Sequence, residues 1–236
     1  MKDNMAQVKA ILFDLDGTIF DIRERDAYAR YQALKDFGHH ISLDDVKKHY
    51  HYGLGSTGIL HELGIKLTEK QEKEYIQASF NHFTNRDTAL RLTRIHPDAH
   101  NVLSTLSKKY KLILVTSRNT LSSTEEELEW FNIRKFFTII ITREVAAKHY
   151  GEENIPLLPF KEQRTKLYKC TIELAKLNPK EMLCIGDAVG EVQPAKQLGI
   201  KTLGILTGFS SKEEMQTASI PTINNLSELA QTLTRN

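Results

Sequence analysis

Cysteine is scarce in this sequence, because only Cys170 and Cys184 occur among its 236 residues. Cys170 falls in a helical pattern and Cys184 in a strand pattern, without a second cysteine near either. Two cysteines without a close pair give neither a disulfide framework nor a zinc site. Isolated thiols of this kind predict buried side chains in a reducing compartment, and we therefore expect a cytoplasmic protein.

Long apolar runs and a large net charge are also missing. No run approaches the roughly 20 apolar residues of a membrane span, and the polar residues 1–7 do not resemble a signal peptide. The formal net charge is only +2 with histidine neutral. Such a balance argues against a dedicated nucleic-acid or membrane-surface protein, so neither partner is expected.

Short apolar segments alternate with amphipathic helical patterns over most of the chain. This alternation predicts a parallel sheet covered by helices on both faces, which is a Rossmann-like three-layer α/β core. The predicted strands, in chain order, are Lys9–Asp14, Lys111–Thr116, Phe136–Ile141, Met182–Ile185 and Lys201–Leu206.

The stretch between the first two predicted strands breaks this alternation. About 70 residues without an apolar strand are too many for a crossover loop. The spacing of Tyr28, Tyr31 and Leu34 is close to that of a helix face. We therefore predict that residues 21–94 form an inserted α-helical cap, and that residues 1–20 and 95–236 form the α/β core.

Polar side chains follow three of the predicted strands. Because the carboxyl ends of parallel strands share one edge of a sheet, these side chains should gather there. They are Asp14, Asp16, Gly17 and Thr18 after the first strand, Thr116, Ser117 and Arg118 after the second, and Asp187 and Glu191 after the fourth.

The acids in this set predict a cation site. Asp14 and Asp16 are two residues apart, so in an extended chain they point to the same side. Two close carboxylates repel each other, which favours a cation between them or a proton on one. Asp187 adds a further oxygen ligand, and an oxygen-only set of this kind suits Mg²⁺.

The order and spacing of these residues resemble those of the haloacid dehalogenase-like hydrolase superfamily. Its first motif, a strand followed by Asp-x-Asp-Gly-Thr, is similar to Ile11–Thr18, and its second to Leu112–Thr116. Its fourth, Gly-Asp with an acid four residues later, is similar to Gly186, Asp187 and Glu191. The cap position resembles the subfamily of phosphoglycolate phosphatases and β-phosphoglucomutases. The resemblance covers nearly the whole chain.

The third motif of that superfamily, a lysine, has two candidates here. The lysine usually lies shortly before the helix that leads into the fourth strand, often as Lys-Pro. Lys161 is followed by Glu162 instead of proline, and Lys166 competes with it. Lys161 is favoured because it precedes the expected start of the helix near Gln163, whereas Lys166 lies inside the helix.

The resemblance implies a Mg²⁺-dependent phosphatase that hydrolyses a small-molecule phosphate monoester through an aspartyl-phosphate. Asp14 would be the nucleophile, and Asp16 would protonate the leaving oxygen and later activate water. Mg²⁺ would be held by Asp14, Asp187 and the backbone carbonyl of Asp16. Thr116 and Lys161 would bind the phosphoryl oxygens and so complete the catalytic set.

The sequence says less about the substrate than about the chemistry. The candidate binding residues are Gly17, Thr116, Ser117 and Arg118, with the loop from Tyr52 to Ser56 as a further contact. By resemblance, the candidate substrates are phosphoglycolate, sugar phosphates and nucleoside monophosphates. The small phosphorylated substrate is the expected partner, and the protein is expected to be a monomer or a homodimer.

Other functions remain open at this stage. A phosphomutase would use the same intermediate, and a catalytically inactive sensor would only bind a phosphorylated ligand. A haloacid dehalogenase is disfavoured by Asp16, because a departing halide needs no proton. Glu191 is consistent both with metal chemistry and with a simple first-turn acid of its helix.

Overall fold

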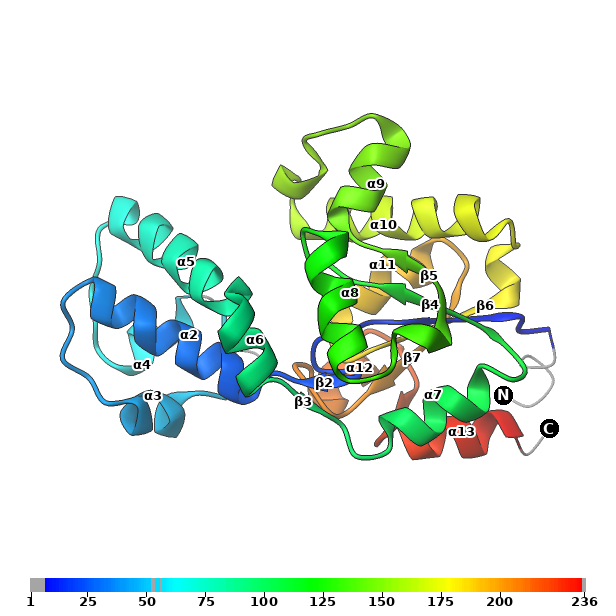
Figure 1. The fold of residues 1–236 in the computed structure, drawn as a ribbon, viewed down its shortest axis with the longest axis horizontal. Helices are drawn as coiled ribbons and strands as arrows, with labels where there is room; N and C mark the ends of the chain where they lie inside the picture. Colours follow the sequence, from blue (N-terminus) through cyan, green and yellow to red (C-terminus); the bar gives the residue numbers. More distant parts are fainter. Residues whose placement is uncertain (1–6, 52–53, 56, 235–236) are drawn as a thin grey trace. The chain divides into compact units, whose positions relative to one another are not determined.

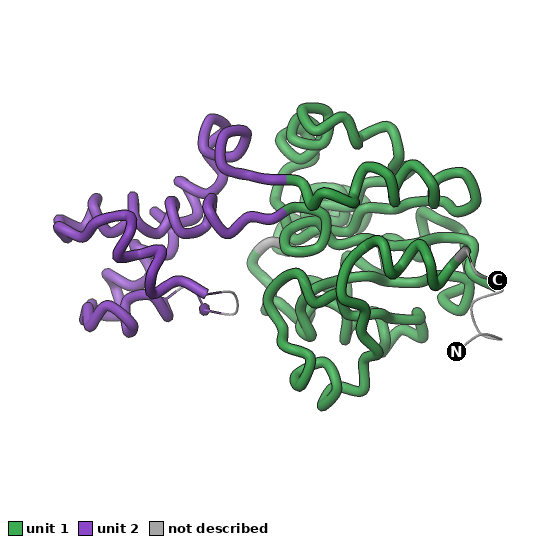
Figure 2. Tube along the Cα trace, turned by 90° about the horizontal axis from the view of Figure 1, so that it is seen from below, with its two compact units in different colours: residues 1–20, 95–236 green, residues 21–94 purple. Residues whose placement is uncertain are grey.

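The structure, a computed structural model, describes residues 7–51, 54–55 and 57–234 (Figure 1). Of the predicted substrate loop, Tyr52, Gly53 and Ser56 therefore lie outside the described residues. The chain divides into two compact units, one of residues 1–20 with 95–236 and one of residues 21–94 (Figure 2).

A parallel sheet forms the centre of the first unit. Among the described residues it has six strands, and each neighbouring pair is parallel. This confirms the predicted Rossmann-like α/β fold class. In spatial order the strands are β5 (Phe137–Ile141), β4 (Lys111–Val115), β1 (Ala10–Phe13), β6 (Met182–Gly186), β7 (Lys201–Ile205) and β8 (Thr222–Ile223).

The register of the central strands decides where the polar residues emerge. All residues of β1 are buried, as expected for an apolar strand with a strand on each side and helices on both faces. Phe13 lies opposite Leu114 of β4 and Ile185 of β6. The residues that follow these three strands therefore leave the sheet at the same edge.

Helices cover the two faces of this sheet (Figure 1). The α7 and α13 helices lie on one side, and α10 and α11 lie on the other. On the second side, Leu12 and Val115 of the sheet share a hydrophobic core with Leu167 and Val192 of the helices. The bounds are α7 (Ala99–Leu106), α8 (Leu121–Trp130), α9 (Arg143–Tyr150), α10 (Phe160–Ala175), α11 (Val189–Gln197), α12 (Lys212–Thr217) and α13 (Leu226–Thr234).

Short 3₁₀ turns join some of these elements, namely η1 (Arg134–Phe136), η2 (Ile155–Leu157) and η3 (Pro179–Glu181). At the boundary of the two units, β2 (Phe20–Asp21) pairs with β3 (Arg94–Ile95) in a small two-stranded sheet. Within the described part of the chain, none of the helices combines the length and apolar character needed to cross a membrane.

The second unit is helical and has its own core. Leu34 and Tyr75 are buried there, and α2 packs against α5. The buried Arg30 pairs with Asp26 at 2.9 Å and donates to the carbonyl oxygen of Gly55 at 2.8 Å, so its charge and donors are engaged. The helices are α2 (Arg23–Asp36), α3 (Leu43–His49), α4 (Gly58–Glu62), α5 (Glu69–Thr84) and α6 (Arg86–Leu92).

Candidate active site

Three carboxylates meet at the edge where β1 and β6 end. Asp14 directly follows β1, and its backbone N–H donates to the Ile185 carbonyl oxygen at 2.9 Å. Asp187 directly follows β6, and Glu191 lies in the first turn of α11. One carboxylate oxygen from each of these three acids lies within 4.8 Å of the other two. Adjacent parallel strands thus join acids that are far apart in the sequence.

Asp187 is closely packed against Gly17 and Gly208, where a larger residue would not fit. Its Oδ2 accepts a hydrogen bond from the Phe209 N–H at 2.8 Å, and its Oδ1 accepts one from Thr18 Oγ1 at 3.3 Å. A Cβ atom would lie 2.1 Å from Oδ2 if placed on Gly17 and 1.8 Å if placed on Gly208. Gly17 also has a φ of +88°, which side chains disfavour. The glycine of the first motif therefore makes room for the acid of the fourth.

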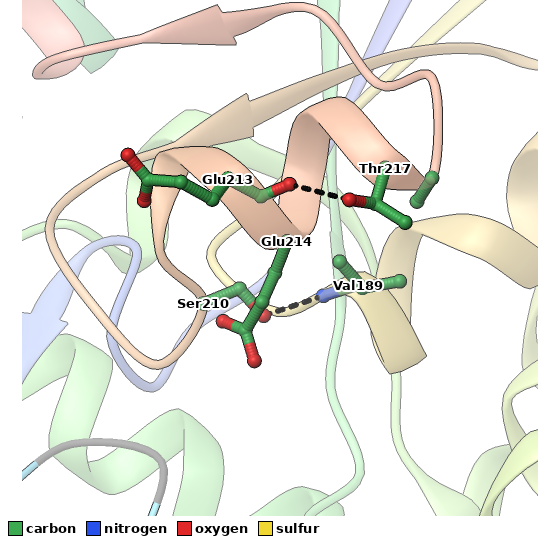
Figure 3. Close-up of a pocket in the computed structure, with 6 residues that line it drawn as sticks. Val189, Ser210, Glu213, Glu214 and Thr217 are labelled. Carbon is green, nitrogen blue, oxygen red and sulfur yellow. Dashed lines mark hydrogen bonds between the residues drawn. The ribbon is translucent and has the colours of Figure 1, made fainter.

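An open hollow of about 450 Å³ adjoins the segment that carries Asp187 (Figure 3). In its wall, Ser210 Oγ accepts a hydrogen bond from the Val189 N–H at 3.1 Å. The Ser210 N–H donates to the Asp187 carbonyl oxygen at 2.9 Å. These bonds tie the loop before α12 to the start of α11, so this wall helps to hold Asp187 in place.

The three acids are electrostatically costly together. Burial raises the pKa of Asp14 well above its usual range, and the nearby Glu191 and Asp187 raise it further against the lowering effect of Arg164. Burial and Glu191 likewise raise the pKa of Asp187. Desolvation also raises the pKa of Glu191. Without a cation, the cluster therefore favours binding protons at a pH where isolated carboxyls would lose them.

The cluster fits a hard divalent cation. Asp14 Oδ2 and Glu191 Oε2 are buried and have no hydrogen-bond partner within the described part of the chain. A cation at this point would satisfy both oxygens and reduce the repulsion, and an oxygen-only set suits Mg²⁺. Glu191 contributes a side chain that the predicted metal set, Asp14, Asp16 and Asp187, did not include.

A buried arginine, Arg164 of α10, lies next to Asp14. Its side chain is 0% exposed, and its Nη1 lies 3.4 Å from Asp14 Oδ1. The same nitrogen donates to the Val115 carbonyl oxygen and to Ser117 Oγ, both at 3.3 Å. Its Nη2 donates to Tyr168 Oη at 2.6 Å, which helps to fix the orientation of the guanidinium. Arg164 is the site residue that the sequence prediction missed.

Within the described residues, neither of the two lysines predicted for this place pairs with Asp14. The α10 helix begins at Phe160, so Lys161 is an exposed residue of its first turn. The expected helix start near Gln163 was wrong, and with it the reason for preferring Lys161. Lys166 pairs with Glu152 at 2.7 Å. The cation that the structure brings to Asp14 is therefore Arg164.

The hydroxyl residues after β4 line the same edge. Thr116 is buried, its N–H donates to the Ile141 carbonyl oxygen at 3.0 Å, and its Oγ1 accepts from the Arg118 N–H at 3.3 Å. Ser117 Oγ accepts from Arg164 as described above. The two hydroxyls therefore directly follow β4, which neighbours the strand that ends just before Asp14, as the shared strand edge predicted.

Arg118 bridges two acids. Its Nε and Nη2 donate to Asp16 at 3.0 and 2.7 Å in a two-pronged ion pair. Its Nη1 lies 2.6 Å from the buried Glu127 of α8. Both carboxylates raise the pKa of Arg118. The guanidinium that was predicted to bind substrate is thus engaged with Asp16 and Glu127, and this arrangement fixes the direction of the Asp16 side chain.

The fold and this strand-end cluster of acids define a hydrolase with a Rossmann-like core. The family model of the haloacid dehalogenase-like hydrolases matches residues 11–205. The chain therefore belongs to the haloacid dehalogenase-like hydrolase family, and the predicted family is confirmed.

Individual relatives agree with this assignment. The chain is 27% identical over 203 residues to a phosphoglycolate phosphatase of Aquifex aeolicus, covering 86% of each protein. It is 27% identical over 234 residues to a glyceraldehyde 3-phosphate phosphatase of Methanocaldococcus jannaschii, covering 94% of this chain and 95% of that protein. A haloacid dehalogenase-like hydrolase from Streptococcus pneumoniae has the same fold, with a TM-score of 0.72, 21% identity, and coverage of 96% and 99%.

Proposed function

We propose that this protein is a Mg²⁺-dependent phosphatase that hydrolyses a small-molecule phosphate monoester through an aspartyl-phosphate. The observation that carries the proposal is that the buried Asp14 is clustered with the acids Asp187 and Glu191 and contacts the guanidinium of Arg164. A nucleophilic carboxylate needs positive charge nearby to approach an anionic phosphate; Arg164 supplies such a charge, and a cation bound by the three acids would supply more. The two phosphatase relatives, which by name act on small phosphorylated compounds, support the same class of substrate.

The proposed reaction has two displacements. In the first, a carboxylate oxygen of Asp14 forms a bond to phosphorus while the phosphorus–oxygen ester bond breaks. For this step Asp16 must be protonated, and so released in part from its ion pair with Arg118, and it then gives its proton to the departing alkoxide, which leaves as the alcohol. In the second, Asp16 takes a proton from water as the water oxygen attacks phosphorus. The bond between Asp14 and phosphorus breaks, which regenerates Asp14 and frees inorganic phosphate.

Binding of the phosphoryl oxygens falls to groups at the end of β4 and on α10. Arg164 provides a fixed positive charge, and Thr116 and Ser117 provide hydroxyl donors on the neighbouring strand. Groups held in advance of the reaction stabilise charge without reorganising, and losing one such donor typically costs roughly 10²–10³ in rate. Lys161 keeps only its predicted role, because its exposed position adds no support for it.

Asp14, Asp187 and Glu191 would hold the metal ion, together with the predicted carbonyl of Asp16. Bound Mg²⁺ would neutralise charge on the phosphate and its attacking carboxylate. We also propose that residues 21–94 act as the cap of this core. The expected cytoplasmic location is supported by the two free, buried thiols of Cys170 and Cys184.

The direct test is release of free phosphate from a panel of phosphate monoesters with Mg²⁺ present. The purified protein should hydrolyse at least one small ester, and the same preparation in excess EDTA should not. A panel left untouched in Mg²⁺ would favour the phosphate-ligand sensor instead. An isomerised sugar phosphate without free phosphate would favour the phosphomutase.

The metal assignment predicts a pH-dependent gain in stability. Because the folded protein holds protons on the three acids that the unfolded chain would release, the metal-free free energy of unfolding should fall as pH rises above about 4.5. Mg²⁺ replaces these protons, so its effect on the melting temperature should be several degrees larger at about pH 7.5 than at about pH 5.5.

Thermal melts with EDTA or Mg²⁺ at the two pH values measure this effect. The matched variant is Glu191→Gln, which keeps the shape of the side chain and removes one charge from the cluster. It should reduce the Mg²⁺-induced shift and raise the metal-free melting temperature at the higher pH. A Mg²⁺ effect that is equal at both pH values, or unaffected by this variant, would contradict a cation site at these acids.

The ion pair between Arg118 and Asp16 predicts sensitivity to the leaving group. Without Arg118 the Asp16 side chain loses its fixed direction, which matters most when the departing oxygen needs a proton. Arg118→Gln should therefore lower kcat roughly tenfold more for an alkyl phosphate than for p-nitrophenyl phosphate, whose phenolate leaves with little help.

The control for this prediction is the double variant Arg118→Gln/Glu127→Gln. The single change removes the guanidinium that lies 2.6 Å from the buried Glu127 and should lower the melting temperature. The second change removes the negative charge of Glu127 as well, so it should recover part of the lost stability but not the kcat for the alkyl ester. An equal loss on both esters would show that Arg118 only supports the fold.

A further inference from the structure

Among the residues that the structure describes, Arg143 has no acidic partner, unlike the other two arginines of the site. It is the first residue of α9, half-buried, and its Nη1 donates to Asn119 Oδ1 at 3.0 Å. Its Nε is buried without a hydrogen-bond partner in the part of the chain that the structure describes. Arg118 and Arg164, by contrast, each contact at least one carboxylate.

The backbone ties Arg143 to the candidate active site. Its N–H donates to the Arg118 carbonyl oxygen at 3.1 Å, and the Glu144 N–H donates to the Asn119 carbonyl oxygen at 3.0 Å. The segment after β5 is therefore joined to the segment that carries Thr116 and Ser117. Arg143 follows β5 and Asp14 follows β1, and only β4 lies between these two strands. The strands are therefore two strand spacings, about 10 Å, apart.

The electrostatic surroundings of Arg143 are unfavourable without a ligand. Burial lowers its pKa, and the positive charge of the nearby Arg164 lowers it further. The carboxylate adjacent in sequence gives no compensation at the site, because Glu144 Oε2 accepts a hydrogen bond from the Leu121 N–H at 2.8 Å. Two neighbouring guanidinium groups, one of them supported only by a neutral amide, favour an anion between or beside them.

We propose that Arg143 binds a second anionic group of the substrate. The phosphate under attack lies at Asp14 and Arg164, so Arg143 recognises a carboxylate or a second phosphate attached close to it. This inference rests on the proposed phosphatase function and narrows its substrates to compact phosphate esters or anhydrides with an additional negative charge. Arg143 is then a residue that determines specificity and not one that takes part in the bond changes.

A matched pair of esters tests the proposal. 2-Phosphoglycolate and 2-hydroxyethyl phosphate have nearly the same size, but only the first has a carboxylate. The wild-type protein with Mg²⁺ should prefer 2-phosphoglycolate in kcat/KM. Arg143→Gln should lower kcat/KM for it by roughly 10- to 100-fold more than for 2-hydroxyethyl phosphate, mainly through KM. Arg143→Lys should keep part of the preference because it retains the charge.

Inorganic pyrophosphate is a further test substrate. If Arg143→Gln lowers kcat/KM for pyrophosphate alone, the second anionic group is a phosphate. Equal losses on both esters, or no loss on either ester or on pyrophosphate, would overturn the proposal. Calorimetric binding of the same three compounds to the Mg²⁺ form separates it from the proposed function. Selective binding that depends on Arg143 but occurs without turnover would uphold the anion site and reject the phosphatase, whereas absence of binding would reject the anion site.

Discussion

Asp14→Asn should abolish turnover and leave the fold intact. The amide has nearly the shape of the carboxylate but cannot attack phosphorus to form the aspartyl-phosphate. We expect a loss of kcat on the order of 10⁴-fold or more, as for removal of other covalent nucleophiles. The measurement is phosphate release with the best ester of the panel, together with a thermal melt of the same preparation.

The expected stability of this variant makes the result decisive. Three buried acids lie close together and repel one another, so removing one negative charge should leave the metal-free melting temperature unchanged or raise it. The matched control is Asp44→Asn, which makes the same chemical change at an exposed position of α3. Near-normal phosphate release by the Asp14 variant would contradict the covalent role. Loss of the thermal unfolding transition would show that the variant is inactive because it does not fold.

The acids of the site could be predicted because short-range sequence patterns determine where they stand. The apolar runs that end at Phe13 and Gly186 fix the ends of β1 and β6, and parallel pairing brings those ends together. Asp14 and Asp187 directly follow these strands, so their proximity needs no knowledge of loop conformation. Glu191 belongs to the same pattern because it lies in the first turn of the helix that follows β6.

The arginines could not be assigned in the same way, because their positions depend on helix register and on contacts between distant segments. Because α10 begins at Phe160 and not near Gln163, Lys161 lies inside the helix and not before it. One signal was present: Arg164 shares a helix face with the buried Leu167 and Tyr168, at spacings of three and four. An arginine on an apolar helix face must find a partner inside the protein.

Arg164→Gln should lower kcat/KM by roughly 10²–10³, because it removes a fixed positive charge from the proposed phosphate site. Lysine is an incomplete replacement. A flexible ammonium cannot hold Asp14, Ser117 and Tyr168 together as the planar guanidinium does. Arg164→Lys should therefore fall between the wild type and Arg164→Gln.

The free energy of unfolding should also depend on Arg164. Without Arg164 the three acids lack their buried counter-charge, and breaking a buried pair of this kind typically costs about 3–5 kcal/mol. Mg²⁺ supplies positive charge to the same acids, so it should restore more stability to Arg164→Gln than it adds to the wild type. Melts with EDTA and with Mg²⁺ measure the difference.

Lys161→Gln decides which residue has the role of the third-motif cation. Its side chain is exposed in the first turn of α10, so its loss should change kcat/KM by no more than about threefold, the scale of a surface substitution. Assayed beside Arg164→Gln on the same ester, it compares two cations that lie one helical turn apart. A larger loss for Lys161→Gln than for Arg164→Gln would return the phosphate-binding role to the lysine and leave Arg164 as a structural counter-ion of Asp14.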